Sequence, residues 1–260
     1  MTGLVRAEMT GLPDGGTCAR LTMRAPRANA LEPGLLADLA RALDDAEAAD
    51  AKVILLCGGP NFSSGGDVRA FQAACLSGEA TAYAAEVVPA LQALVLRLIA
   101  MKRLVVVAAR GAITGGSAGL LFAADLAVLA PDAFVQPYYS RVGFAPDGGW
   151  TALLPERIGA GRALEWLQSD RRLSAEGLRA MSLATAVSDT PEADAEALAS
   201  HGALGVRLAA KALIWDEARR ESIHARLEAE TASFLDRIAR PETLRGMERF
   251  LVGLGGRSDV

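Results

Sequence analysis

The sequence has 260 residues, of which 51% are hydrophobic and 22% charged, and a formal net charge of −4 at pH 7. This is enough apolar material for one large core, or for one core and a smaller C-terminal module. The small acidic excess and the lack of a dense lysine and arginine run argue against nucleic acid or an anionic membrane as the partner.

Targeting and metal-binding signals are missing from the sequence. Met1–Thr10 does not show a basic segment followed by an apolar one, and we find no apolar run as long as a membrane span. We therefore expect a cytoplasmic protein. Cys18, Cys57 and Cys75 are odd in number and lack metal or redox spacing, so we expect free thiols, no disulfide and no metal site.

Up to about Gly159, short apolar runs alternate with amphipathic segments. The unbroken apolar runs are typical of strands that are covered on both faces. This alternation is the pattern of stacked crossover units and predicts an α/β fold. The predicted strands are Thr17–Met23, Val53–Cys57, Leu104–Ala108 and Leu126–Leu129, and the predicted helices are Pro33–Ala48 and a segment that includes Val87–Ile99.

Beyond Gly159 the strand pattern almost disappears and helices dominate. We divide the chain into a core domain, 1–195, and a C-terminal helical oligomerisation region, 196–260. One long helix in this region carries an apolar stripe, which either completes the core or contacts a second copy of the chain. The stripe consists of Ile223, Leu227, Phe234, Leu235 and Ile238.

Two glycine-rich turns, Asn61–Asp67 and Gly111–Gly119, each follow an apolar run and open a predicted helix. Backbone N–H groups at a helix start lack intrahelical partners, so two such turns that face each other would form an oxyanion hole. Turns of this composition are also common as plain connections, and neither matches a dinucleotide fingerprint or a phosphate loop. The residues alone leave both interpretations open.

Several motifs stand in a fixed order along the chain: Arg27–Leu31, Phe62–Val68, Gly111–Gly119, Ala124–Leu126 and Val142–Gly149. With them the chain, from about Arg20 to its C-terminus, resembles the crotonase family, the enoyl-coenzyme A hydratase/isomerase superfamily. The resemblance implies a spiral of ββα units followed by a C-terminal helical trimerisation region. It also implies an acyl-coenzyme A thioester as substrate, no cofactor beyond the coenzyme A of that substrate, and a homotrimer or dimer of trimers.

The resemblance assigns the oxyanion hole to Gly66 and Gly116. Their backbone N–H groups correspond to the two donors that hold the thioester carbonyl in the family. This assignment suits the chemistry, because a thioester enolate carries negative charge on that oxygen. A preorganised donor there is typically worth ~10²–10³ in rate.

The coenzyme-binding residues are also assigned by resemblance. The backbone carbonyls of Ser64 and Val68 align with positions that contact adenine in the family. Arg24 or Arg27 would pair with coenzyme phosphates, the alternative being that each is a solvated surface arginine. Lys211 is a weaker candidate for the same role.

Hydratases of the family use two glutamates to activate water and deliver a proton. Those positions are occupied here by Gly119 and Tyr138. Neither side chain can act as a carboxylate base, so hydration in the usual way is not expected. Tyr138 stays a candidate substrate-binding residue.

Asp147 is the carboxylate that remains, within Ala145–Gly149. Without the family, Pro-Asp-Gly-Gly is ordinary turn chemistry. The resemblance implies a proton shuttle, because family members that shift double bonds or rearrange ring acyl-coenzyme A substrates place an aspartate here. The run Val142–Gly149 is especially similar to the ring-1,2-epoxyphenylacetyl-coenzyme A isomerase type.

A proton shuttle requires a mostly dry pocket, which raises the pKa of the carboxyl toward the operating pH. Phe144, Trp150, Tyr138 and Tyr139 are near enough in sequence to line such a pocket, or they pack in the core. Arg141 also lies close by, and an arginine beside Asp147 would lower its pKa.

We therefore expect an acyl-coenzyme A isomerase with Asp147 as its proton shuttle. Three alternatives stay open: a hydratase with displaced acid/base groups, a ring-closing synthase of the dihydroxynaphthoyl-coenzyme A type, and a non-catalytic acyl-coenzyme A-binding subunit. Asp67 is expected to cap a helix and Asp125 to fix a loop. The acyl pocket is expected near Phe71–Val88.

Overall fold

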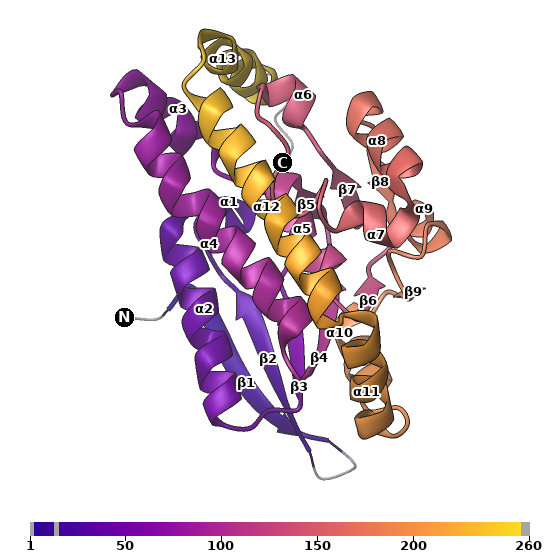
Figure 1. Ribbon diagram of the computed structural model, residues 1–260. Coiled ribbons are helices and arrows are strands. Elements are labelled where there is room, and N and C mark those ends of the chain that lie inside the picture. Colours follow the sequence, from indigo (N-terminus) through magenta and orange to yellow (C-terminus); the bar gives the residue numbers. More distant parts are fainter. Residues whose placement is uncertain (1–2, 13–15, 256–260) are drawn as a thin grey trace.

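The computed structural model describes residues 3–12 and 16–255. Within these residues the main sheet has six strands in the order β1-β2-β3-β4-β6-β9 (Figure 1). β1 is antiparallel to β2, and the other neighbouring pairs are parallel. The strands are β1 (Val5–Gly11), β2 (Thr17–Met23), β3 (Val53–Cys57), β4 (Leu104–Ala109), β6 (Leu126–Leu129) and β9 (Ala186–Val187).

A smaller sheet has β7 (Phe134–Gln136) at its centre, parallel to β5 (Ala112–Thr114) and antiparallel to β8 (Leu173–Ser174). The helices up to residue 180 are α1 (Pro26–Asn29), α2 (Pro33–Ala48), α3 (Val68–Leu76), α4 (Ala80–Ala100), α5 (Ala118–Phe122), α6 (Tyr139–Val142), α7 (Leu154–Ile158), α8 (Ala160–Ser169) and α9 (Ala175–Ala180). They are followed by α10 (Pro191–Ala199), α11 (Leu204–Ile214), α12 (Glu217–Ile238) and α13 (Pro241–Gly255).

Two apolar cores cover the two faces of the main sheet. Along β3, Ile54 and Leu56 belong to the large core with α2 and α4, whereas Val53 and Leu55 belong to a smaller core covered by α10. Because successive residues of a strand point to opposite faces, a strand between two cores must be apolar throughout. The predicted α/β fold with a helical C-terminal region is confirmed.

Most of the predicted elements occur with the predicted bounds. β2, β3, β6 and α2 match them residue for residue, and β4 extends one residue further, to Ala109. β1 was not predicted, because it is an edge strand with mostly exposed side chains and so lacks a buried apolar pattern.

α4 is the one described helix that is long and apolar enough to cross a membrane by length and composition. Our expectation that no apolar segment is as long as a membrane span was therefore wrong. The helix lies between α2 and α12 (Figure 1), and residues at helical spacing along it are buried in the large core, among them Val87, Leu91 and Leu98. This burial is typical of a core helix.

The C-terminal helices pack on the same core. α12 lies along α4, and α13 contacts α3 and α6 (Figure 1). Of the predicted stripe, Ile223, Leu227, Phe234 and Ile238 are buried, so the stripe completes the core of its own chain. The division at residue 195 falls inside α10, and it stays a prediction.

The three cysteines are free thiols, as expected. Cys18 and Cys57 are buried and Cys75 is half-buried. Burial raises the pKa of Cys18 to about 11 and that of Cys57 to about 12. Both groups are therefore un-ionised at neutral pH and act as small apolar side chains.

Candidate active site

The two glycine-rich turns lie against each other. The N–H of Ser63 donates to the carbonyl of Ala112 at 2.9 Å, and the N–H of Thr114 donates to the carbonyl of Ser63 at 3.1 Å. A Cβ atom on Gly65, whose φ is +78°, would lie 2.5 Å from the Thr114 oxygen. Only a glycine at this position permits such a close approach of the two backbones.

Gly66 and Gly116 line one cavity of about 450 Å³. Gly116 belongs to the 3-10 turn Gly115–Ser117 that precedes α5, and N–H groups in a first helical turn have no intrahelical partner. The N–H of Gly66 is in none of the backbone hydrogen bonds between described residues outside regular helices and strands. Both amides are thus available to a ligand in this cavity.

Asp147 lies beside Gly116 in the same cavity. A Cβ atom on Gly116 would lie 2.9 Å from each of the two carboxylate oxygens. The side chain is only 7% exposed, and the hydroxyl of Tyr139 donates to its Oδ1 at 2.7 Å. Burial raises the pKa of Asp147 from its ordinary value of 3.8 to about 7, the hydrogen bond from Tyr139 opposes this rise, and the charge of Glu230 adds to it.

The sequence after Asp147 explains how the carboxylate reaches this place. Gly148 and Gly149 have φ of +66° and +99°, a conformation that a side chain would strain. A Cβ atom on Gly148 would lie 2.4 Å from the oxygen of Gly116. The indole N–H of Trp150 donates to the carbonyl of Gly115 at 2.7 Å. The Pro-Asp-Gly-Gly turn is therefore packed directly on the second glycine turn.

Glu230 of α12 holds the other end of this turn, and sequence analysis missed it. Its buried carboxylate accepts the N–H groups of Gly149 at 2.8 Å, Thr151 at 2.6 Å and Ala152 at 3.0 Å. Burial raises the pKa of Glu230, and the hydrogen bonds to it oppose this rise. A signal was present in the sequence, because Glu230 stands between Leu227 and Phe234 on the apolar stripe of its helix, where a lone carboxylate needs a buried partner.

The enoyl-CoA hydratase/isomerase family model matches residues 14–251. The chain belongs to this family. YhaR of Bacillus subtilis (strain 168) is 31% identical over 170 residues, which are 65% of each chain. Cyclohexa-1,5-dienecarbonyl-CoA hydratase of Thauera aromatica is 30% identical over 246 residues, 91% of this chain and 90% of that one. The crystal structure of enoyl-CoA hydratase from Bacillus halodurans has the same fold, with a TM-score of 0.84, 19% identity, and 95% of this chain and 100% of that chain covered.

The position of the first family glutamate is closed in this chain. A Cβ atom on Gly119 would lie 1.7 Å from the carbonyl oxygen of Gly148. No side chain fits there while the Asp147 turn keeps its place. The backbone conformation itself therefore excludes a glutamate at this position.

Tyr138 stands at the position of the second family glutamate and lines the cavity. Its backbone is left-handed, with φ of +62°, and its N–H donates to Asp170 Oδ1 at 2.6 Å. Its ring packs edge-on against Phe250 of α13, with a centroid distance of 5.4 Å. Arg141 also turns to this side, where its Nε donates to Asp170 Oδ2 at 2.6 Å. Arg141 thus pairs with Asp170 and does not pair with Asp147.

The predicted apolar lining is partly confirmed. Tyr138, Tyr139 and Phe144 line the cavity, whereas Trp150 is fully buried behind them and does not. Phe144 packs on Phe71 and Phe234 with ring centroids 5.1 Å apart in each case. Phe234 and Phe250 also line the cavity. Their contribution was not predicted, because they belong to helices that are remote in sequence. Of the predicted acyl pocket Phe71–Val88, the cavity lining includes Phe71 and Val87.

Three of the four candidate coenzyme residues line the cavity. Ser64 and Val68 line it, and so does Arg27. The guanidinium of Arg27 is already paired with Glu32 and Asp67, each at 2.6 Å. Arg24 is exposed and lies outside the lining. The coenzyme-binding roles of Ser64, Val68, Arg24 and Arg27 stay predictions.

The motif Arg27–Leu31 supports the first glycine turn. Arg27, Ala28 and Asn29 are all left-handed, with φ between 53° and 56°, which is costly for residues other than glycine. The amide of Asn29 offsets this cost by donating to the carbonyl of Gly58 at 2.7 Å. The hydroxyl of Ser63 donates to the carbonyl of Asn29, also at 2.7 Å.

Asp67 and Asp125 have the structural roles that we expected. Asp67 accepts the N–H of Arg69 at 2.9 Å and thereby caps α3. Asp125 accepts the N–H of Val105 at 2.8 Å and the ammonium of Lys211 at 2.9 Å. Lys211 is buried and also donates to the carbonyl of Leu98. It is therefore not available to a coenzyme phosphate.

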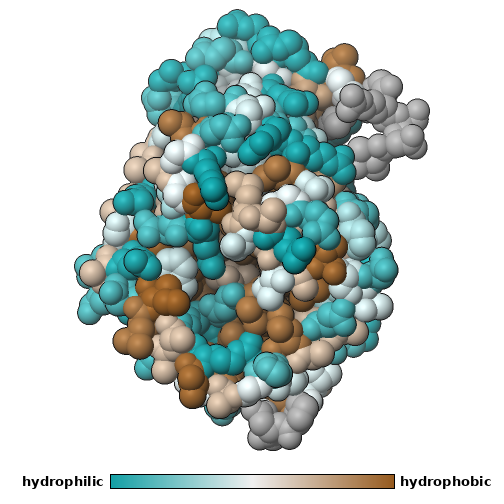
Figure 2. Space-filling model, turned by 90° about the vertical axis from the view of Figure 1, so that its right-hand side faces the viewer, coloured by the Kyte–Doolittle hydropathy of each residue, from teal (hydrophilic) through white to brown (hydrophobic). Residues whose placement is uncertain are grey.

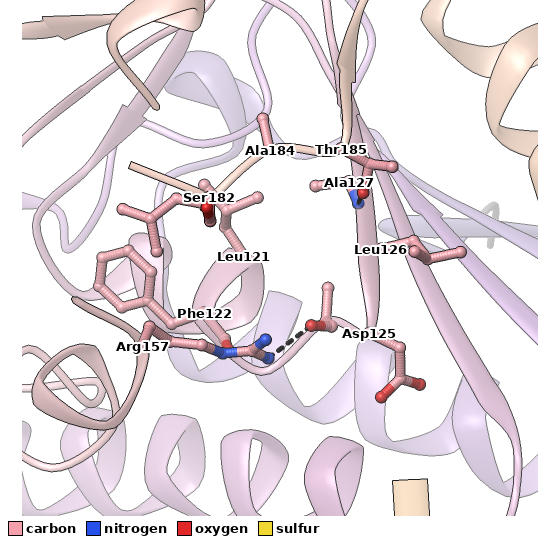
Figure 3. Close-up of a pocket in the computed structure, with 11 residues that line it drawn as sticks. Leu121, Phe122, Asp125, Leu126, Ala127, Arg157, Ser182, Ala184 and Thr185 are labelled. Atoms are coloured by element: carbon pink, nitrogen blue, oxygen red, sulfur yellow. Dashed lines mark hydrogen bonds between the residues drawn. The ribbon is translucent and has the colours of Figure 1, made fainter. Parts of the chain in front are cut away.

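A second, much smaller cavity of about 30 Å³ lies beside Arg157 (Figure 3). Nη2 of Arg157 donates to the carbonyl of Ala124 at 2.6 Å, and Nε donates to that of Phe122 at 3.0 Å. These bonds tie α7 to the end of α5. In residues 3–12 and 16–255 we find no group of three or more His, Cys, Asp or Glu side chains that could hold a metal ion.

Proposed function

We propose that this chain isomerises an acyl-coenzyme A thioester, with Asp147 as the single proton carrier. The observation that supports this proposal is the buried Asp147 carboxylate beside the Gly116 turn, in a cavity that Gly66 also lines. The closed position at Gly119 points the same way, because it leaves no room for the first glutamate of a hydratase.

In the proposed mechanism, the thioester carbonyl accepts hydrogen bonds from the N–H groups of Gly66 and Gly116. Asp147 removes a proton from one carbon of the acyl group, and the electron pair of that C–H bond moves into the conjugated system to form an enolate. The two amides stabilise the negative oxygen. Asp147 then returns its proton to another carbon, so that the double bond has moved and no water is consumed.

The acidity of Asp147 suits both halves of this cycle. A group with a pKa of about 7 exists as base and as acid in similar amounts at neutral pH. An ordinary aspartate would accept a proton poorly from carbon. The burial that raises this pKa is therefore the feature on which the proton shuttle depends.

For the acyl group we propose a ring or another unsaturated group of similar bulk. The cavity is lined by the aromatic side chains of Phe71, Phe144, Phe234, Tyr138 and Phe250. The relative from Thauera aromatica, which matches over 91% of this chain, is named for a cyclic dienoyl thioester.

That same relative favours a second candidate function, hydration of a cyclic dienoyl thioester. The two candidates differ in the fate of water. A panel of straight-chain enoyl, dienoyl and ring-epoxide thioesters, incubated in ¹⁸O-labelled water and analysed by mass spectrometry, separates them. Isomerisation leaves the mass of the thioester unchanged. A product that contains labelled oxygen would show hydration, and the hydratase would then replace our proposal.

We also propose a homotrimer or a dimer of trimers. Apolar side chains of α11 are exposed, namely Val206, Leu213 and Ile214. Figure 2 shows the side of the molecule that is on the right in Figure 1, where hydrophobic patches gather in the lower part. Light scattering on the purified protein tests the proposal, and a mass equal to one chain would overturn it.

A further inference from the structure

Tyr139 makes the closest polar contact with the Asp147 carboxylate. Its hydroxyl lies 2.7 Å from Oδ1 and 3.0 Å from the Asp147 carbonyl oxygen. A phenol has one proton, and the shorter contact directs it to Oδ1. Across the described residues, no other side chain donates a hydrogen bond to this carboxylate, and the only further donor is the backbone N–H of Asp147 itself. Oδ2 therefore has no side-chain donor and is the oxygen that is left to take up a proton from a ligand.

Tyr139 remains a donor over the whole physiological range. Its side chain is buried, and burial raises its pKa well above the ordinary value, with the negative charge of Asp147 adding to the effect. The hydroxyl therefore does not ionise when Asp147 does. It can stabilise the carboxylate form of Asp147, but it cannot take the proton that Asp147 carries.

The position of Tyr139 is fixed from two sides. Before it, Tyr138 is held in its left-handed conformation by the bond from its N–H to Asp170. Beside it, the ring packs edge-on against Trp150 with a centroid distance of 6.1 Å and an interplanar angle of 86°. Because the ring is held in this way, its hydroxyl keeps one direction toward the Asp147 turn.

We propose that Tyr139 is a positioning residue that holds Oδ1 of Asp147, so that Oδ2 alone exchanges the proton with the substrate. This inference rests on the proposed function of Asp147. The only other charged group that bears on Asp147 within the described residues is Glu230 of α12, because Arg141 is paired with Asp170. Removing the Tyr139 hydroxyl leaves both of these groups in place.

The test is Tyr139→Phe, which deletes one hydroxyl from a buried ring. We expect kcat to fall roughly tenfold, because a hydrogen bond to a charged group is lost, while KM stays within about twofold. Since the lost bond favours the charged form, the pKa of Asp147 rises. The acid limb of kcat/KM therefore moves to higher pH.

Tyr83→Phe is the matched control. The Tyr83 hydroxyl is also buried, has no hydrogen-bond partner among the described residues, and does not line the cavity. Its ring packs edge-on against Phe71 at 4.9 Å, so the two substitutions remove the same group in similar aromatic surroundings. We expect the acid limb of this variant to stay in place.

A second readout does not need turnover. In protein labelled with ¹³C at the aspartate carboxyl carbons, the Asp147 signal is assigned by its loss in Asp147→Asn and is titrated by NMR. We expect its midpoint to move to higher pH in Tyr139→Phe and to stay unchanged in Tyr83→Phe. If Tyr139→Phe does not fold, 3-fluorotyrosine at position 139, a stronger donor, is expected to move the midpoint to lower pH.

The outcomes separate the two proposals. If the wild type isomerises and Asp147→Asn does not, while Tyr139→Phe keeps the wild-type kcat and acid limb, the Tyr139 inference is overturned and the proposed function stands. If the wild type does not isomerise any thioester, the proposed function fails. The NMR titration then still decides the inference, and an unmoved Asp147 midpoint in both position-139 variants would overturn it.

Discussion

Two aspartates lie next to glycine pairs in this protein, in Gly65-Gly66-Asp67 and in Asp147-Gly148-Gly149, and they have different partners. Both line the same cavity, and they are similarly buried, at 8% and 7% exposure. Asp67 pairs with the guanidinium of Arg27 at 2.6 Å and accepts two N–H groups at the start of α3. Asp147 accepts from one other side chain among the described residues, the neutral hydroxyl of Tyr139.

This difference shows that burial alone does not make a carboxylate a base. Asp67 is bound by the guanidinium of Arg27 and by the N–H groups at the start of α3, which gives it a structural role. Asp147 has no cation beside it among the residues that the structure describes, and burial raises its pKa to about 7. The same residue type beside similar turns thus serves as a helix cap in one place and, in our proposal, transfers a proton in the other.

The largest effect that sharpens this comparison is expected for Asp147→Asn. Removing the proton carrier is expected to lower kcat by roughly 10³-fold, within the range for general acid and base groups. Asp67→Asn serves as the matched control: its side-chain oxygen can still cap α3, so stability is expected to fall by no more than about 1 kcal/mol, through the lost ion pair with Arg27, with a much smaller change in kcat. Thioester isomerisation followed by ultraviolet absorbance measures kcat, and a larger loss in Asp67→Asn would break the comparison.

Gly119→Ala tests the close packing of the Asp147 turn, at Gly148, on the second glycine turn, at Gly119. Its methyl group would lie 1.7 Å from the Gly148 oxygen, so the Asp147 turn must move. We expect a loss of about 3 kcal/mol or more in the free energy of unfolding in urea, together with loss of activity. Gly161→Ala in α8, where no atom of a described residue lies within 4 Å of the new methyl group, is expected to be neutral or stabilising. Equal stability of the two variants would show that the turn is not fixed by this contact.

Asp147 is also expected to lower stability at neutral pH. Its folded pKa of about 7 exceeds the ordinary 3.8, so the folded state holds this proton more tightly than the unfolded state. Stability is therefore lost as pH rises through this interval. Asp147→Asn should be more stable than the wild type by roughly 2 kcal/mol or more at pH 8, with the difference gone near pH 4. Urea unfolding at both pH values measures it, and an equal difference at both would contradict the raised pKa.

The smallest effect is expected for Arg141→Ala. Arg141 is 57% exposed at the side chain and pairs with Asp170, so its charge is directed away from Asp147. Loss of this pair is expected to cost no more than about 1 kcal/mol. The acid limb of kcat/KM should not move, and a shift to higher pH would show that Arg141 does stabilise the Asp147 carboxylate.

The fold could be predicted from the sequence where one strong signal decided each element. Val53–Cys57 is apolar at every position because both faces of β3 are covered, and α2 begins at Pro33 with leucines at helical spacing. β1 was not predicted, because an exposed edge strand lacks a buried apolar pattern. The glycine turns were located in the sequence, but their mutual contact depends on Ser63 and Ala112, which only the fold brings together.

The candidate site was predictable only in part. Asp147 and the two glycines were found by resemblance, and the structure places Asp147 beside Gly116. The contributions of Glu230, Phe234 and Phe250 were not found, because they reach the site from α12 and α13 across a long separation in sequence. Trp150 was assigned to the lining because it is close to Asp147 in sequence. The chain reverses its direction within a few residues at this turn, and Trp150 is fully buried outside the lining.

The most direct test of the central claim is to follow a deuterium label through one turnover. A thioester that carries deuterium at the carbon from which Asp147 removes its proton is isomerised in ordinary water, and the product is analysed by mass spectrometry. A single buried carboxylate that carries the label across is expected to deliver a measurable share of it to the second carbon. Complete loss of the label in every turnover, with no transfer to the second carbon, would contradict the account.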